Sequence, residues 1–180
     1  MKTLLRIFAF TALFAFVVYA ADDAASAIHG TVTKVDSAAK TITVKTKDGT
    51  EHALHYVDKT VVKGGEGAAD AGKDSYKSIK EGSEVVVEYT KKGTVVTADE
   101  IDKLSKKTAK TVEGTVVKVG KDGKTVTIKT ADGTEKTFET AGKGAEISAK
   151  DVGKGTEKGA KVTVTYTEKA GKAIGHFFEF

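Results

Sequence analysis

Four histidines are the residues of this chain best suited to hold a metal ion, and two of them, His52 and His55, form an H-x-x-H pair. Imidazole nitrogens are common zinc ligands, and closely spaced pairs can bind one ion. The pair lies, however, in residues 50–57, which we predict to be a β-strand. Side chains three positions apart in a strand point to opposite faces, so these two cannot hold one ion. We predict no metal and no other cofactor.

Residues 67–73 nearly match the phosphate-binding motif G-x-x-x-x-G-K-[ST]. Asp74 stands where the motif needs Ser or Thr, and it adds negative charge where a phosphate must lie. The motif also requires a preceding strand and a following long helix in an α/β fold, and the surrounding sequence, GGEGAADAGKDS, is typical of a solvated loop. We therefore predict no nucleotide site.

The chain offers little else for covalent or acid–base catalysis. It contains no cysteine, and none of its serines lies in a G-x-S-x-G elbow. Its Asp and Glu residues alternate with Lys at turns and on the polar faces of predicted strands, whereas a catalytic carboxylate needs a pocket that raises its pKa. The sequence predicts a protein that is not an enzyme and has no catalytic residues.

The N-terminus has the pattern of a cleavable signal peptide. Lys2 and Arg6 precede an apolar run over residues 7–18, and small residues follow at the positions that a signal peptidase reads, with cleavage after Ala20 or Ala21. The apolar run is shorter than the roughly 20 residues of a membrane span. We predict a signal peptide over residues 1–20, a periplasmic or extracellular location, and no stable membrane insertion after cleavage.

Charge distribution argues against nucleic acid as the ligand. The chain has 29 Lys plus Arg against 25 Asp plus Glu, and the predicted cleavage removes two of the basic residues. A nucleic-acid binder normally concentrates its basic residues on one face. Here Lys, Asp and Glu are interspersed along the whole chain, which indicates a solvated surface that screens itself.

An internal repeat organises the sequence. Residues 28–54 align without a gap onto residues 112–138, and more than half of the aligned positions are identical. A second block, GSEVVVEYT at residues 82–90, matches GAKVTVTYT at residues 159–167. None of His29, His52 and His55 recurs, because Glu113, Lys136 and Glu139 occupy their positions in the second copy. The repeat predicts two domains, residues 26–104 and 111–180, joined by a short linker at residues 105–110.

Within each repeat, Val, Ile and Thr alternate with a period of two residues, which indicates half-buried antiparallel strands. Asp48-Gly49 and Asp132-Gly133 separate apolar runs, and we predict type I′ hairpin turns there. Long connections of helical or turn character lie at residues 75–82 and 141–158. The predicted strands are residues 27–35, 40–47, 50–57, 83–91, 94–103, 111–119, 124–131, 134–140, 160–167 and 172–180. The predicted fold is all-β, with two tandem five-stranded antiparallel OB-like barrels.

These patterns resemble a known family. G-T-V-x-K-V, then K-T-[IV]-T-[VI]-K-T-x-D-G-T, a long loop, G-x-x-V-x-V-x-Y and a last apolar strand are similar to bacterial secreted domains of unknown function with an OB-like β-barrel. The resemblance covers nearly all of both repeats and consists of turn and strand residues. It implies an envelope location and a binding or structural role, without catalytic residues.

The last predicted strand departs from that pattern, because it ends in AIGHFFEF. Alternation places Ile174, His176, Phe178 and Phe180 on one face and Phe177 on the other. One interpretation is that the first set closes the second barrel while Phe177 covers the junction between the domains. The other is that Phe177, Phe178 and Phe180 bind a partner protein or a second copy of the chain.

The predicted function is a non-enzymatic exported binding or structural module of the cell envelope that acts in protein interaction or assembly. The alternative is a binder of anionic polymer, envelope polysaccharide or nucleic acid, through Lys-rich barrel faces that include Lys45 and Lys129.

Overall fold

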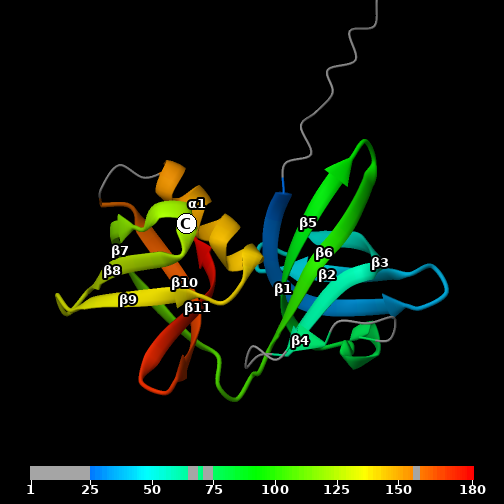
Figure 1. Ribbon diagram of the computed structural model, residues 1–180, viewed down its shortest axis with the longest axis horizontal. Helices are drawn as coiled ribbons and strands as arrows, with labels where there is room; N and C mark the ends of the chain where they lie inside the picture. The colour runs from blue at the N-terminus through cyan, green and yellow to red at the C-terminus, as the bar shows by residue number, and fades with distance from the viewer. Residues whose placement is uncertain (1–24, 65–68, 71–74, 156–158) are drawn as a thin grey trace, which may run out of the picture.

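The computed structural model describes residues 25–64, 69–70, 75–155 and 159–180, and it contains two β-barrels placed side by side (Figure 1). The predicted signal peptide lies outside the described residues, as does the phosphate-loop-like segment except for residues 69–70. Within the described part of the chain, no helix is both long enough and apolar enough to span a bilayer.

The first barrel is built from β1 (Ala25–Asp36), β2 (Thr41–Thr46), β3 (Glu51–Gly64), β4 (Ala69–Asp70), a 3-10 helix η1 (Ser75–Ser78), β5 (Glu84–Lys92) and β6 (Val95–Leu104). Its strand order is β2-β1-β5-β6-β3-β4, and an additional pairing of β2 with β3 closes the ring. Five strands therefore form the barrel, and the short β4 lies beside β3.

The second barrel is built from β7 (Lys110–Val119), a 3-10 helix η2 (Lys121–Gly123), β8 (Thr125–Thr130), β9 (Glu135–Thr140), the helix α1 (Lys143–Gly155), β10 (Lys161–Lys169) and β11 (Lys172–Glu179). Its closed order is β10-β11-β9-β8-β7. Each predicted strand is present, and most ends agree to within one or two residues. The exception is β3, which continues to Gly64.

Pairing within the barrels is mixed, so the prediction of purely antiparallel sheets is wrong. β3 pairs with β6 in parallel, and β9 pairs with β11 in parallel. The reason is the odd number of strands. Each antiparallel pairing reverses the chain direction, so a ring of five strands closes only if at least one pair is parallel.

The two barrels share their strand register. β1 pairs with β2, and β7 with β8, through equivalent residues of the repeat, and both ladders contain a β-bulge at the same place, between Val32 and Lys34 in one and between Val116 and Lys118 in the other. The β5–β6 and β10–β11 hairpins also carry matching bulges, at Glu88/Tyr89 and Thr165/Tyr166. The sequence repeat is therefore a repeat of three-dimensional structure.

The Asp-Gly turns have a different geometry from the predicted one. Gly49 and Gly133 have φ of 89° and 85°. Asp48 and Asp132 do not have a positive φ, although a type I′ turn requires one at both central residues. The Gly49 N–H donates to the Thr46 carbonyl, which makes a three-residue loop with glycine in the left-handed position. The type I′ prediction is wrong there because the Asp carboxylate accepts hydrogen bonds from Thr46 and Thr50, which fixes a type I turn instead.

Each barrel has its own apolar core, formed by the inward positions of the predicted alternation. The fully buried residues include Ile42, Val44, Leu54, Val85 and Val87 in the first barrel, and Val126, Ile128, Phe138, Val162 and Val164 in the second. The prediction of which strand face is buried is confirmed at these positions.

We expect the glycine shared by both repeats to be required for closure. A Cβ on Gly30 would clash with the Lys45 backbone carbonyl, and one on Gly114 would lie 2.8 Å from the Lys129 carbonyl oxygen. Gly30→Ala and Gly114→Ala should each lower the free energy of unfolding in urea by about 1–3 kcal/mol, as overpacking does. Gly153→Ala is the control, because that exposed helix position has only ordinary contacts. It should be neutral or stabilising, and equal losses in all three variants would contradict this account.

Candidate functional site

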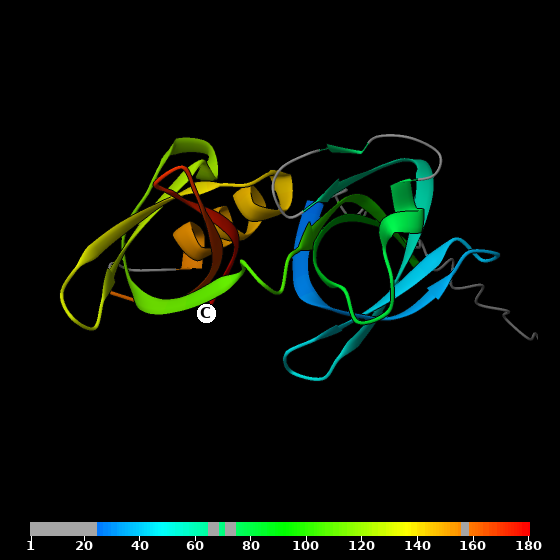
Figure 2. The ribbon, with the colours of Figure 1, turned by 90° about the horizontal axis from the view of Figure 1, so that it is seen from below.

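The two barrels meet where helix α1 and strand β11 of the second barrel pack against β1, β5 and β6 of the first (Figures 1 and 2). The start of α1 comes very close to the first barrel, since a Cβ on Gly144 would lie 3.1 Å from Val86 Cγ1. Val86 points away from its own barrel core and is nevertheless 2 % exposed. The junction is therefore a packed interface.

Charged side chains line this interface on the first barrel. Glu88, Glu100 and Asp102 are buried, and the Lys63 ammonium lies 2.8 Å from a Glu100 carboxylate oxygen. Burial raises the pKa of Glu88, and the neighbouring Glu100 and Asp99 raise it further, while Lys143 at the start of α1 opposes the shift. Buried carboxylates are costly unless they are paired. Lys63 pairs with Glu100 within the first barrel, whereas Lys143 attracts Glu88 across the junction.

His176 makes the most buried polar link between the barrels. Its Nδ1 lies 2.7 Å from Asp102 Oδ2 of the first barrel, and its Nε2 lies 2.9 Å from Thr167 Oγ1 of the second. Thr167, His176 and Asp102 thus stand in the hydrogen-bonded order of a nucleophile–His–Asp triad. All three side chains are buried, so substrate has no access to the hydroxyl, and the arrangement acts as a link between domains.

A β-bulge decides how the C-terminal strand presents its residues. Thr165 pairs with Phe177 and Tyr166 pairs with Gly175, so His176 is the extra residue. The prediction that His176 and Phe178 share one face is therefore wrong. His176 points to the first barrel, whereas Phe178 lies in the core of the second, edge-on to Phe138 at a centroid distance of 6.4 Å.

The three predicted partner-binding aromatics have different environments. Phe178 is 2 % exposed and closes the second barrel, whereas Phe180 is 63 % exposed. Phe177 is partly buried at the junction, where its ring centroid lies 5.5 Å from that of His29 in β1. Phe178 packs in the second barrel and Phe177 lies at the junction, whereas His176 and Phe180, which the first interpretation also placed in the barrel, do not close it. Partner binding by all three stays a prediction.

Three neighbouring clefts surround the end of β11 and share lining residues, and we call them together the junction groove. The central cleft, of about 780 Å³, is lined by both barrels: His29, Gly30, Thr31, Thr33, Lys45, Thr46, Lys47, Glu84, Thr111, Val112, Glu113, Thr163, Thr165 and Glu179. The lysine cleft, of about 470 Å³, adds Gly114, Thr115, Lys129, Thr130, Ala131, Lys161, Val162 and Phe180. The aromatic cleft, of about 380 Å³, adds Ala27, Ile28, Asp48, His52, Ser148, Asp151, Val152, Phe177 and Phe178.

Charge is distributed unevenly along the groove. Lys129 and Lys161 dominate the lysine cleft, while the aromatic cleft contains Asp48, Asp151 and Glu179 and no lysine. The central cleft contains both signs and is rich in threonine hydroxyls. Hydroxyls, ammonium groups and carboxylates along one groove can form hydrogen bonds and ion pairs with an extended polar ligand.

The H-x-x-H pair is divided between two environments. His52 lines the aromatic cleft, whereas His55 is exposed on the outward side of β3. Within the described residues, no group of three or more His, Asp or Glu side chains is arranged to hold a metal ion.

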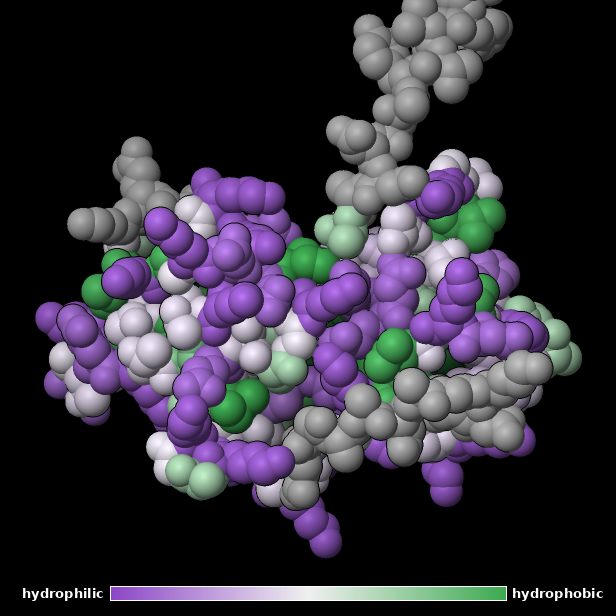
Figure 3. Space-filling model, viewed as in Figure 1, coloured by the Kyte–Doolittle hydropathy of each residue, from purple (hydrophilic) through white to green (hydrophobic). Residues whose placement is uncertain are grey.

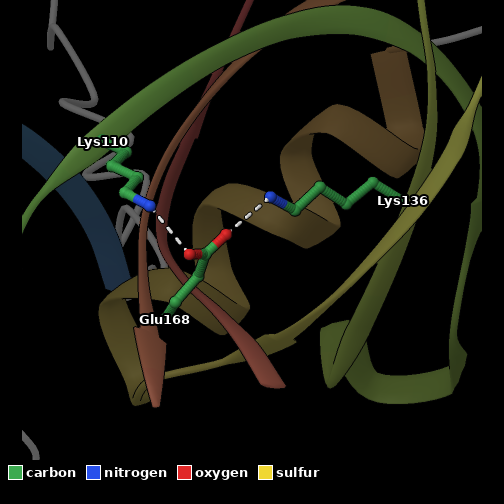
Figure 4. Close-up of polar contacts among 3 residues, drawn as sticks. All are labelled: Lys110, Lys136 and Glu168. Atoms are coloured by element: carbon green, nitrogen blue, oxygen red, sulfur yellow. Dashed lines mark hydrogen bonds and ion pairs between the residues drawn. The ribbon is translucent and has the colours of Figure 1, made fainter. Parts of the chain in front are cut away.

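A second cluster of charged residues lies on the second barrel. Glu168 accepts hydrogen bonds from Lys110 Nζ at 2.7 Å and from Lys136 Nζ at 3.2 Å (Figure 4). These contacts lower the pKa of Glu168, and Lys136 also lies 4.0 Å from the Tyr166 ring centroid. The cluster joins β7, β9 and β10 of one barrel, and its carboxylate is already occupied, so we interpret it as structural.

Sequence reasoning missed the role of Asp102 and His176, because they are far apart in the chain and belong to different domains. A signal was present, however. His29 and His176 occupy positions where the other repeat has Glu113 and Asp99, and both histidines lie at the junction. At these two positions, the difference between the copies lies at the junction.

Comparisons with known proteins add little to this site. No protein family model matches the chain, and no curated protein matches its sequence. Among solved structures, the crystal structure of Ag(I)CusF is similar with a TM-score of 0.34 and 17% sequence identity, over 46% of this chain and 99% of that chain.

Removing the carboxylate of Asp102 should loosen the junction. Asp102→Ala leaves the buried His176 imidazole without its partner, so we expect the free energy of unfolding to fall by about 1–3 kcal/mol. The measurement is urea unfolding, with a double-mutant cycle to His176→Ala that should show coupling. Glu168→Ala, which breaks an exposed cluster within one barrel, is the control and should cost less. Additive losses for Asp102 and His176 would contradict a direct link.

Glu88→Gln should stabilise the protein at neutral pH. Since the folded-state pKa of Glu88 is raised, its contribution to stability is present below its ordinary pKa and is lost as the pH rises through the raised value. The advantage of the variant should therefore be largest at pH 7 and shrink as the pH falls toward 4. Thermal unfolding across this range measures the difference, and an advantage that grows on acidification would show the opposite shift.

Proposed function

We propose that the protein is a non-enzymatic exported binding module of the cell envelope, and that the junction groove holds a segment of a partner protein. The observation that carries this proposal is the position of Phe180. It is a large apolar side chain, 63 % exposed, and it lines two of the three clefts. Large aromatic residues are enriched among the anchors of protein interfaces.

The rest of the surface supports this location. Hydrophilic residues cover most of the face seen in Figure 3, and hydrophobic residues are confined to small separate spots. Val57 and Val95, the other large exposed apolar residues in the described part of the chain, lie on the first barrel and line none of the three clefts. An apolar anchor beside charged and hydroxyl groups makes the groove the best place for a specific contact.

The partner would bind through side chains rather than as an added strand. β11 is paired with β10 along its length and with β9 up to Gly175. Beyond that point, helix α1 covers the strand, and the Phe178 N–H donates to Ser148 Oγ at 3.3 Å. Strand addition needs unpaired backbone groups, and this part of the C-terminal strand already uses them.

The location and the lack of enzymatic activity belong to the same proposal. The pattern over residues 1–20 supports export, and the threonine hydroxyls and charged groups of the groove can hold a ligand through hydrogen bonds and ion pairs alone. Export brings the protein to the envelope, and the groove residues would then bind the partner there.

The alternative function, binding of an anionic polymer, is favoured by one observation. Lys45 and Lys129, both predicted from sequence, line neighbouring clefts of the groove, and Lys47 and Lys161 lie beside them. Glu84, Glu113 and Glu179 line the same clefts and would repel a polyanion. The charge balance therefore favours the protein partner.

A photo-crosslinking residue at position 180 should capture the partner in living cells. We expect a discrete crosslinked species with the probe at Phe180, and none with the probe at Val95, which is 48 % exposed and lines none of the three clefts. The crosslinked species is identified by mass spectrometry after purification from the envelope. Equal crosslinking at both positions would indicate random encounters and contradict the proposal.

Salt dependence separates the two functions. If the ligand is an anionic polymer, binding to dextran sulfate should weaken steeply between low and physiological salt, and Lys45→Gln with Lys129→Gln should reduce the slope. If the ligand is a protein segment, we expect weak dextran sulfate binding that these changes affect no more than the control pair Lys59→Gln and Lys118→Gln. Tight binding that only the groove variants abolish would establish the alternative.

A further inference from the structure

The aromatic cleft combines an apolar wall with negative charge. Phe177, Phe180 and Ile28 supply rings and an aliphatic side chain, and the cleft has a volume of about 380 Å³. Its carboxylates come from three elements of both barrels: Asp48 from the β2–β3 loop, Asp151 from α1, and Glu179 from β11. The cleft therefore exists only because the barrels are docked as they are.

Two of the three carboxylates have no ion pair among the described contacts that would neutralise them. Asp48 accepts hydrogen bonds from Thr46 and Thr50, and these neutral donors lower its pKa to about 2, so it stays ionised at any physiological pH. Glu179 lies on β11 opposite Thr163. Asp151 lies 3.7 Å from Lys154, an exposed pair one helical turn apart that solvent screens.

We propose that the aromatic cleft receives a lysine or arginine side chain of the partner polypeptide, an inference that rests on the proposed function of the junction groove. The cation would lie between Asp48, Asp151 and Glu179, and its aliphatic stem would lie against Phe177 and Phe180.

The chemistry of the cleft matches both parts of such a side chain. Lysine and arginine bury an apolar stem while the charged group stays near polar atoms. An aromatic ring attracts a nearby cation by about 0.5–2 kcal/mol, and the carboxylates add attraction of the same sign. A carboxylate or a phosphate would meet repulsion from all three acids, so charge complementarity selects a cationic side chain.

Contacts of His29 hold one wall of the aromatic cleft in place. His29 forms part of its wall and is held by Glu84, since His29 Nε2 lies 2.9 Å from Glu84 Oε1. The same histidine contacts the Phe177 ring. This arrangement holds the Phe177 ring in place before a ligand arrives, which lowers the ordering cost of binding.

The test is an NMR titration of the full mature chain with a Gly-Ser peptide that carries one central lysine. We expect amide shifts around Asp48, Phe177 and Phe180, and similar shifts with an arginine peptide. The norleucine and acetyl-lysine peptides keep the stem but lose the charge, so each should bind roughly fivefold more weakly or worse.

The repeat supplies a matched control variant. Asp48 and Asp132 make the same turn contacts, with Thr46 and Thr50 in one repeat and Thr130 and Thr134 in the other, but only Asp48 lines the aromatic cleft. Asp48→Asn and Asp132→Asn should therefore cost similar stability in thermal unfolding. Only Asp48→Asn should weaken the lysine peptide, and Glu179→Gln should weaken it as well.

Several outcomes would overturn the inference. They are equal binding of the lysine and norleucine peptides, equal weakening by Asp48→Asn and Asp132→Asn, or shifts that lie outside the cleft. Sedimentation showing a dimer that Asp48→Asn dissolves would assign the cleft to a lysine of a second copy instead. A partner that crosslinks at Phe180 but binds Asp48→Asn normally would leave the proposed function intact and refute only the cationic side chain.

Discussion

The outward face of the β5–β6 hairpin is the constraint on which the rest of the structure depends. It carries Val86, Glu88, Glu100 and Asp102, and all four are buried. A polar face of this kind is stable away from water only if a partner supplies hydrogen bonds and opposite charge. The second barrel supplies them through His176 on β11 and through Lys143 at the start of α1. Docking of the barrels is thus a condition for satisfying these carboxylates.

The duplication explains how such a junction can be specified. Both copies keep the residues that build a barrel, including the bulges, the Asp-Gly turns and the glycine at which two strands approach closely. Among their differences is the element that packs between the barrels. In the first copy the connection between the third and fourth barrel strands includes η1, whereas in the second it includes the helix α1, which lies between the barrels (Figure 2). The first barrel contributes its outward strand face to the junction, and the second contributes helix α1 and strand β11.

The junction groove is a consequence of that docking. The central and aromatic clefts are lined by residues of both barrels, whereas the lysine cleft belongs to the second barrel alone, so neither barrel by itself contains the whole site. The candidate site therefore depends on how the two barrels are placed relative to each other, and no sequence motif of either barrel forms it alone. It also separates the roles of the C-terminal aromatics: Phe178 stabilises a core, Phe177 lies at the junction, and Phe180 is available to a ligand.

The sequence by itself determined the two barrels. Alternating Val, Ile and Thr residues identify the buried face of each strand because side chains of a strand alternate strictly between faces, and this local rule places Ile42, Val44, Val126 and Ile128 correctly in the cores. Only the tertiary structure decided the parallel strand pairs, the bulge that turns His176 away from Phe178, and the contact of His176 with Asp102. These features come from ring closure and from packing between residues distant in the chain. Local alternation contains no information about such residues, so the groove could not be derived before the barrels were placed together.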